Sequence, residues 1–320
     1  MPITLAESKV GMSPKVDQMV IDEFRRGSFL LDTLVFDNSV SPGTGGSTLG
    51  YGYVRLETPS TAQFRDINEE YKGNEAKRKD HYAKLKIFGG KFSLDRVIIN
   101  TSGAVDELDF QMKEKISAAL NLFHNTVING DSAVDVKSFD GLDVMLTGSD
   151  TEFHTAAAID LSTSAKMDAN YNEFLDLMNE FVAVMKGKPT MLLMNSTMLV
   201  KMKSIARRAG YYSRMEDAFG RSIDMWDTIP LVDLEEYYDG TKTTKCVPTD
   251  ETTGETSMYA VQIALDGFHG VSPQGDKVIT GALPNLAEPG VMKEGDVEMV
   301  AAVVLKNTKK AGVFRRIKVQ

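Results

Sequence analysis

The fold is decided by one continuous stretch, residues 89–131, which reads GGKFSLDRVIINTSGAVDELDFQMKEKISAALNLFHNTVINGD. Its second half places apolar side chains three and four residues apart, a spacing that puts them on one side of an α-helix. These side chains belong to Leu108, Met112, Ile116, Leu120, Phe123 and Val127. We therefore predict a single amphipathic helix over Ala104–Asn129, about 37 Å long at 1.5 Å per residue.

The ends of this helix carry capping signals. Thr101 or Ser102 can cap its beginning, because a hydroxyl oxygen accepts a hydrogen bond from the first free N–H groups. Gly130 follows its last residue and favours a left-handed cap. His124 is predicted to lie off the apolar stripe, and a lone histidine there is not expected to act in catalysis.

Upstream of the helix, two strand-like segments flank a charged stretch. Residues alternate in polarity over 49–54 and 84–94, which is typical of strands with one covered face. Residues 65–80 hold five cations and five anions, and their only bulky apolar residues are Ile67 and Tyr71. Such a segment cannot build a core, so it is either a disordered loop or the tip of a long two-stranded arm lying on another surface. The candidate intersubunit residues of this tip, which we place at 62–84, are Arg65, Asp66, Glu69, Glu70, Lys72, Glu75, Lys77, Arg78 and Lys79.

Downstream of the helix, helical and strand patterns are interleaved. Residues 147–164 are rich in Ser, Thr, Asp and Ala and are predicted to cross between two units, and a helix is predicted over Tyr171–Lys186. Ser196 is expected to cap a third helix. Strands are predicted over Thr190–Met194, Ile229–Val232, Met258–Ile263, Val278–Ile279, Val297–Val304 and Gly312–Val319. Because no regular βα repeat occurs, the pattern predicts an α+β fold.

Composition excludes several classes of function. The chain has 320 residues and a net charge of −9, which argues against a protein that wraps nucleic acid through many phosphate contacts, although a container wall that faces nucleic acid stays open. A single cysteine, Cys246, excludes an internal disulfide and a multi-cysteine metal site. Residues 1–20 contain no apolar core of a signal peptide, and no window is long and apolar enough for a membrane span.

The N-terminal segment, the Gly-rich segment that follows it and the C-terminal segment show weaker patterns. Residues 15–26 have helical spacing, and the Gly-rich segment 41–47 is predicted to be a flexible joint, because it lacks the Gly-Lys-Ser/Thr ending of a phosphate loop. Six cations and no anions follow Glu298. These cations could contact an acidic partner or nucleic acid, but we expect that they lie on a solvated strand face.

An enzyme is the weakest of the functions we considered. Asp131, Asp135 and Asp140 lie close together in the sequence, and clustered carboxylates can hold a divalent cation. Their spacing does not match an EF-hand loop, and turn-forming aspartates are the commoner reason for such a group. We therefore expect no catalytic residues, no cofactor and no metal.

The order of these elements resembles that of the major capsid proteins of tailed bacteriophages, whose shell fold also occurs in encapsulins and in the floor of herpesvirus capsids. The resemblance rests on residues 89–131 and on the FDGL of 139–142. It implies an N-terminal arm over 1–47 and an extended loop over 48–95. It also implies a peripheral domain with a spine helix over 96–150 and 286–320, and an axial domain over 151–285.

The resemblance also implies a function. It implies pentamers and hexamers that self-assemble into an icosahedral shell enclosing double-stranded DNA, assembled in the host cytoplasm and found in the virion. A portal protein is the implied partner, and a scaffolding protein, a protease or a decoration protein could be others. We expect no membrane among the partners. The alternative is an encapsulin-type nanocompartment, which by resemblance begins with a short helix instead of an arm and a long hairpin.

Two features of some relatives are not expected here. Some join a loop lysine covalently to an asparagine just before the final strands, but residues 286–306 contain no asparagine. We therefore expect shells without covalent crosslinks. The arm is also shorter than the helical extension that some relatives use as a built-in scaffold, so we expect a separate scaffolding protein or none.

Overall fold

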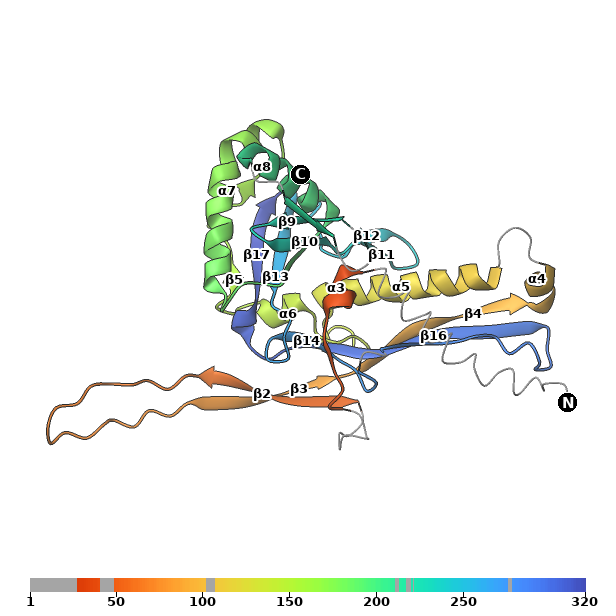
Figure 1. Cartoon of the computed structure of the whole chain (residues 1–320), viewed down its shortest axis with the longest axis horizontal. Coiled ribbons are helices and arrows are strands. Elements are labelled where there is room, and N and C mark those ends of the chain that lie inside the picture. The colour runs from red at the N-terminus through yellow and green to blue at the C-terminus, as the bar shows by residue number, and fades with distance from the viewer. Residues whose placement is uncertain are drawn as a thin grey trace.

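The computed structural model describes residues 28–40, 49–101, 107–210, 213–216, 220, 222–275 and 278–320. A compact body lies between two projections, a two-stranded arm on one side and a long helix lying on a ribbon of strands on the other (Figure 1). The structure does not describe the predicted helix at 15–26, the joint at 41–47 or the predicted cap Ser102. Thr101, the other predicted cap, is the last residue of helix α4 (Arg96–Thr101).

The long helix is the clearest confirmed prediction. Helix α5 spans Glu107–Asn129 and buries Met112, Ile116 and Phe123. Its end differs from expectation, because Gly130 has no left-handed backbone. A Cβ on Gly130 would lie 2.2 Å from the carbonyl oxygen of Phe139. The glycine is therefore required by the close approach of the returning chain, whose Gly141 N–H donates to the Gly130 carbonyl over 2.7 Å.

A five-stranded sheet lies under α5. Strand β16 (Met292–Leu305) pairs antiparallel with β4 (Lys86–Asp95) over ten residue pairs, from Met292–Asp95 to Ala301–Lys86. Strand β16 also pairs with β15 (Ile279–Ala282) and β14 (Phe268–Val271), and β14 pairs parallel with β1 (Phe36–Asp37). The short helix α3 (Phe29–Thr33) precedes β1 in the chain, and the short helix α4 (Arg96–Thr101) directly follows β4.

An eight-stranded sheet forms the rest of the body, in the order β5-β17-β13-β7-β10-β9-β8, with β6 also paired to β17. Its strands are β5 (Glu152–Phe153), β6 (Ile159–Asp160), β7 (Met191–Met194), β8 (Ser213–Glu216), β9 (Ser222–Trp226), β10 (Ile229–Asp233), β13 (Glu255–Val261) and β17 (Ala311–Lys318). Helices α7 (Ser164–Val184) and α8 (Ser196–Ala209) belong to the same half of the body (Figure 1).

This sheet separates two apolar cores. Side chains alternate across a strand, so Leu193 of β7 joins the core that contains α5, while Leu192 joins the core that contains α7 and α8. Both side chains are fully buried. Because both faces of β7 are covered, the strand reads as a continuous apolar run, as the sequence predicted.

Two local predictions for this half are corrected. Helix α7 begins at Ser164 with Thr163 as its cap, seven residues before the expected Tyr171, because its first two turns bury only Met167 and so lack an apolar stripe. Helix α8 is capped by Asn195 and not by Ser196. The Asn195 side chain accepts from the Met198 N–H over 2.8 Å and also donates to the Val247 carbonyl over 3.0 Å.

Apart from the two strands of the arm, the remaining elements are short. They are α6 (Leu142–Leu146), the hairpin of β11 (Glu236–Tyr238) and β12 (Thr243–Lys245), and a 3-10 turn at Thr308–Lys310. The β11 strand contacts α5. Helices α3 and α6 and strands β8 and β14 were not predicted, because four or five residues are too few to display a period. Strands β7 and β10 are as short, but their continuous apolar runs predicted them.

Candidate assembly surfaces

The charged stretch forms the end of a two-stranded arm. Strands β2 (Gly50–Thr58) and β3 (Lys77–Lys84) pair antiparallel from Gly50–Lys84 outward. Beyond them, side chains continue the ladder. The Asn74 amide donates to the Thr61 hydroxyl over 2.8 Å, and the Gln63 amide donates to the Lys72 carbonyl over 2.8 Å. The chain reverses at Ile67–Asn68, where Asn68 has a φ of 67°. The segment is thus an extended ribbon along its whole length.

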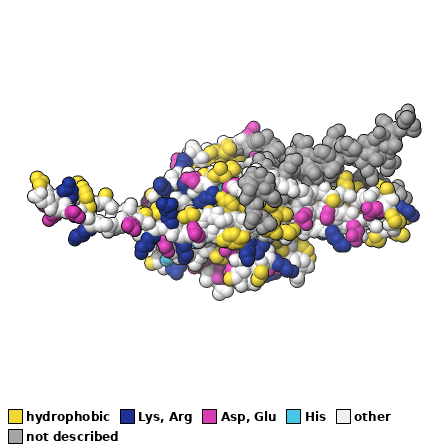
Figure 2. All heavy atoms as spheres, turned by 90° about the horizontal axis from the view of Figure 1, so that it is seen from below, with side chains coloured by type: hydrophobic (Ala, Val, Ile, Leu, Met, Phe, Trp, Pro, Cys, Tyr) yellow, Lys and Arg dark blue, Asp and Glu magenta, His cyan; other side chains and the backbone are white. Residues whose placement is uncertain are grey.

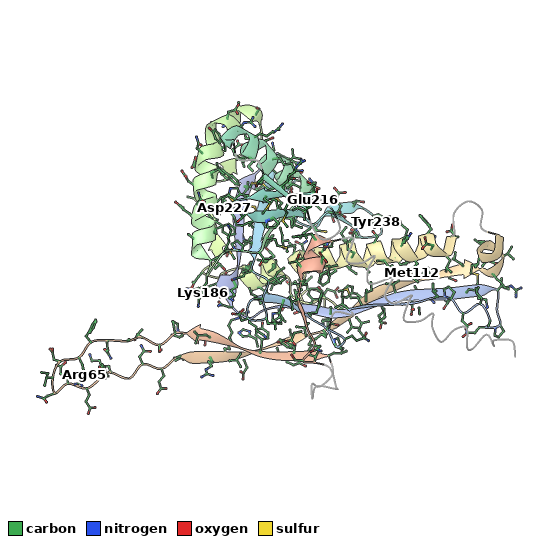
Figure 3. All side chains as sticks on the ribbon, viewed as in Figure 1. Arg65, Met112, Lys186, Glu216, Asp227 and Tyr238 are labelled. Atoms are coloured by element: carbon green, nitrogen blue, oxygen red, sulfur yellow. The ribbon has the colours of Figure 1, made fainter. Side chains whose placement is uncertain are left out.

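All nine predicted intersubunit residues lie on this arm, and every residue from 56 to 80 is exposed. None of the nine makes an ion pair with another residue in the described parts of the chain. Arg65 donates to the Asp66 and Glu69 carbonyls over 3.3 and 3.2 Å and lies 5.3 Å from the ring centre of Tyr71. Figure 3 labels it at the far end of the arm.

Three large apolar side chains share the tip with these charges. Phe64 is 105% exposed, Ile67 89% and Tyr71 65%. Figure 2 shows the arm as a thin projection whose end carries apolar, cationic and anionic side chains together. The charge pattern of the sequence predicted only charged residues as intersubunit contacts. It did not include Phe64, because this residue directly precedes the charged run of 65–80. Burying such side chains against another surface is worth roughly 1.5–3 kcal/mol each.

The root of the arm is held firmly on the body. The Tyr51 hydroxyl donates to Asp37 over 2.7 Å, and Arg55 donates to the Leu305 carbonyl over 2.5 Å. Burial and the Asp37 carboxylate raise the pKa of Tyr51 well above its usual range. Tyr53 stacks on His81 with ring centres 5.5 Å apart. Burial, with Arg55 and Lys79 nearby, lowers the pKa of His81 and so favours its neutral form.

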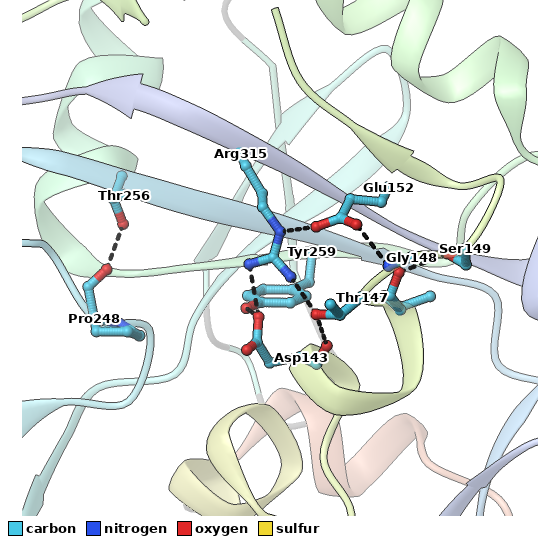
Figure 4. A network of polar contacts seen from close by, with 10 residues as sticks. Asp143, Thr147, Gly148, Ser149, Glu152, Pro248, Thr256, Tyr259 and Arg315 are labelled. Atoms are coloured by element: carbon cyan, nitrogen blue, oxygen red, sulfur yellow. Dashed lines mark hydrogen bonds and ion pairs between the residues drawn. The ribbon is translucent and has the colours of Figure 1, made fainter.

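A second polar cluster joins α6 to the eight-stranded sheet (Figure 4). Arg315 of β17 donates to Glu152 over 2.5 Å, to Asp143 over 2.7 Å and to Thr147 over 3.0 Å. The Tyr259 hydroxyl donates to the same Asp143 oxygen over 3.0 Å. Burial tends to raise the pKa of Glu152, but hydrogen bonds from Gly148 and Arg315 outweigh it and the pKa is lowered. One cation thus fastens the loop after α6 to the sheet.

A β-bulge directs Arg315 into this cluster. Met258 pairs with Phe314 and Thr256 with Ile317, so two residues of β17 stand opposite one residue of β13. Arg316, at the bulge, has a φ of 61° and donates to the carbonyls of Thr155 and Ala156 over 3.3 and 3.0 Å. Bulges re-aim side chains in this way. The C-terminal cations expected on a solvated face are therefore partly engaged within the chain.

His124 is placed differently from the prediction. It is 2% exposed, and its Nε2 lies 2.6 Å from the hydroxyl of Ser28, which caps α3. Burial lowers the pKa of His124 to about 4. The helix therefore buries more than the predicted stripe, because a segment distant in the sequence covers this side. The pair is a structural contact between α3 and α5.

The three clustered aspartates act as turn residues. Asp131 accepts from the Ala133 N–H, Asp135 from the Lys137 N–H and Asp140 from the Ser132 N–H, each over 2.8–2.9 Å. Within the described ranges, no three His, Cys, Asp or Glu side chains gather as metal ligands would. Across the same ranges, every helix falls short of the length and apolarity that crossing a membrane requires.

No family model matches the chain, and no curated protein sequence matches it. Its structure is similar to the holo-SrpI encapsulin complex from Synechococcus elongatus PCC 7942, with a TM-score of 0.58 and 14% identity over 91% of this chain and 88% of that chain. It is similar to the capsid of Myoviridae phage XM1, with a TM-score of 0.54 and 11% identity over 90% and 91%. It is also similar to a virus-like particle from Pyrococcus furiosus, with a TM-score of 0.51 and 12% identity over 95% and 100%. At such low identity the likeness concerns architecture, and the chain has the α+β shell fold that phage capsids, virus-like particles and encapsulins share.

Proposed function

We propose that this chain is a structural shell protein whose copies self-assemble into a closed icosahedral particle, with no catalytic role. The observation that carries the proposal is the arm. Residues 56–80 are exposed along their whole length, and the tip presents Phe64 and Ile67 almost completely to solvent. A slender ribbon with an apolar tip gains little within its own chain, whereas a second copy could bury it. In a shell built from many copies, such an arm has a second copy against which its tip can be buried.

We further propose the phage capsid as the specific form, with pentamers and hexamers enclosing double-stranded DNA in the virion and meeting a portal protein. The long hairpin supports this choice. The acidic net charge of −9 suits a wall that must not hold DNA tightly. An encapsulin-type compartment is the alternative, since an encapsulin is among the similar structures.

The domain division follows the same proposal. We assign an N-terminal arm to 1–47, an extended loop to 48–95, a peripheral domain to 96–150 and 286–320, and an axial domain to 151–285. The nine charged residues of the arm are proposed as intersubunit contacts, together with the three apolar residues of its tip. Scaffolding, protease or decoration proteins would be further partners.

Electron microscopy and sedimentation of the purified protein test the proposal. We expect closed, uniform shells or regular sheets when the chain is expressed alone or with the proteins of its own source. Small discrete particles at every concentration and salt tested would contradict a shell function. The contents of native particles then separate the two forms, since nuclease-protected DNA supports a phage capsid and a protein cargo supports an encapsulin.

A further inference from the structure

Cations and anions are equal in number over residues 65–80, but over the whole arm they concentrate at different places. The tip loop, residues 59–76, carries two cations and four anions. The paired strands β2 and β3 carry five cations and two anions. The arm is therefore acidic and apolar at its tip and basic along its stem. Such a separation makes one end of the arm electrostatically complementary to the other.

A cavity of about 320 Å³ lies at the root of this stem. We call it the root cavity, and its lining includes Tyr53, His81, Lys84, Lys86, Phe139 and Met145. The walls thus combine aromatic and apolar surface with two ammonium groups. Lys86 donates to the Val136 carbonyl at one edge. The carboxylate of Asp140, also in the lining, accepts from the Ser132 N–H.

Two other cavities of the described structure have a different charge. A cavity of about 230 Å³ beside α3 is bordered by Asp224, Asp233 and Glu235, and its cation Lys203 is already paired with Asp224 over 2.7 Å. A cavity of about 520 Å³ beside the β9–β10 turn is bordered by Asp227 and by no cation. An acidic tip would be repelled by the first and not attracted by the second, so charge favours the root cavity.

We propose that the arm tip of one copy, carrying Phe64, Ile67 and Tyr71, docks at the root cavity of a second copy, with tip carboxylates against Lys84. A tip cannot reach its own root, because the ribbon is straight (Figure 1) and spans on the order of 40 Å at about 3.3 Å per residue. The contact uses different patches on its two copies and so repeats from copy to copy, closing a ring or shell if the rotation closes. This inference rests on the proposed shell function and names the partner surface of the arm.

Cysteine crosslinking tests the contact directly. Cys246, the only cysteine of the sequence, is buried, so we expect little crosslinking through the native thiol. The variant Ile67→Cys with Ser132→Cys places one thiol on the tip and one at the rim of the root cavity. In assembled particles we expect an oxidant to give a ladder of covalent multimers, which a reductant removes. Mixed particles of the two single-cysteine chains should give covalent dimers.

The matched control is Ile67→Cys with Asn179→Cys, whose second thiol lies at the cavity bordered by Asp227. Equal ladders from the two double variants, or no ladder from the first in particles of normal size, would overturn the tip-to-root contact while leaving the shell function intact. Absence of particles from the unmodified protein would overturn the shell function, and the contact with it.

A charge exchange gives a second readout. Lys84→Glu at the root should raise the protein concentration needed for half-maximal assembly several-fold, and Glu69→Lys with Glu70→Lys at the tip should do the same. Combining both sets should restore assembly toward the unmodified level, because opposite charges then face each other again. Additive losses in the combined variant would count against the pairing. Circular dichroism on each variant checks that the fold is unchanged.

Discussion

The arm and the eight-stranded sheet use side chains in opposite ways. In β7 every side chain is buried, and each strand face belongs to a different core. In the arm, residues 56–80 bury nothing within the chain. The sheet therefore stabilises the monomer, while the arm is held in shape by its ladder and contributes little to folding. The difference separates the residues that build the core from the exposed residues of the arm, and under the proposed function folding and assembly would depend on different residues of this chain.

The largest loss of stability is expected from removing one aromatic ring from the core of the sheet. Phe314 is fully buried and contacts Phe153, Phe174 and Phe181, with ring centres 5.0–6.0 Å apart. Phe314→Ala should lower the free energy of unfolding by about 3–5 kcal/mol, because it leaves a cavity. Urea denaturation followed by circular dichroism measures this.

The matched control is Phe64→Ala on the arm, which removes the same ring from an exposed site. It should change the unfolding free energy by less than about 0.5 kcal/mol yet weaken assembly. A comparable loss of stability from both variants would show that the arm belongs to the folding unit.

The buried His124 gives a pH-dependent effect of nearly the same size. Its folded pKa of about 4 lies below the ordinary value of 6.5, so the unfolded chain binds the proton more readily. Stability contributed by the neutral ring is present above pH 6.5 and is lost as pH falls toward 4, by roughly 3 kcal/mol. Unfolding free energies from pH 4 to 7 should show this slope.

His124→Gln should remove that part of the slope, because glutamine does not titrate. His154→Gln is the control for placing a glutamine at an exposed histidine position, and it should leave the unfolding free energy at pH 7 near its original value. An identical slope in the unmodified protein and in both variants would contradict a neutral, buried His124.

A smaller effect is expected at the Arg315 cluster, whose arginine side chain is 24% exposed. Arg315→Met should cost about 1–3 kcal/mol, since Asp143 and Glu152 lose their cation. The folded pKa of Glu152 is lowered from 4.5, so its contribution is present above pH 4.5 and is lost as pH falls through the folded value. Glu152→Gln should therefore be less stable than the unmodified protein near neutral pH, and the difference in unfolding free energy should become smaller in acid. A difference that does not change with pH would contradict the ion pair.

The smallest effect on folding, and a complete effect on assembly, is expected from the arm tip. The variant replaces residues 59–76 with a short Gly-Ser linker, which leaves both strands of the arm, β2 and β3, intact. Helical content and unfolding free energy should stay near their original values, because loop length changes closure entropy only slowly. Sedimentation should show loss of stable closed shells. Normal shells from this variant would refute the intersubunit arm.

Several features of the fold follow from the sequence by itself. The stripe from Met112 to Val127 predicted α5, and the alternating or continuous apolar runs predicted β2, β7, β16 and β17. Each of these is a local property, because a period of 3.6 or 2 is visible within one segment. The α+β class followed from their order. The charge of residues 65–80 pointed to the arm as a candidate surface.

Only the tertiary structure decided what depends on residues far apart. His124 is buried because α3, which begins some hundred positions earlier in the chain, covers it. Gly130 is needed because Phe139 and Gly141 return against it. The pairing of β16 with β4 and the meeting of Arg315 with Asp143 span long separations for which a single sequence has no period. The division of the arm into a basic stem and an acidic tip also came from the structure. The sequence showed that the charges of 65–80 are balanced, but only the bounds of the paired strands show which of them lie on the stem and which on the tip loop.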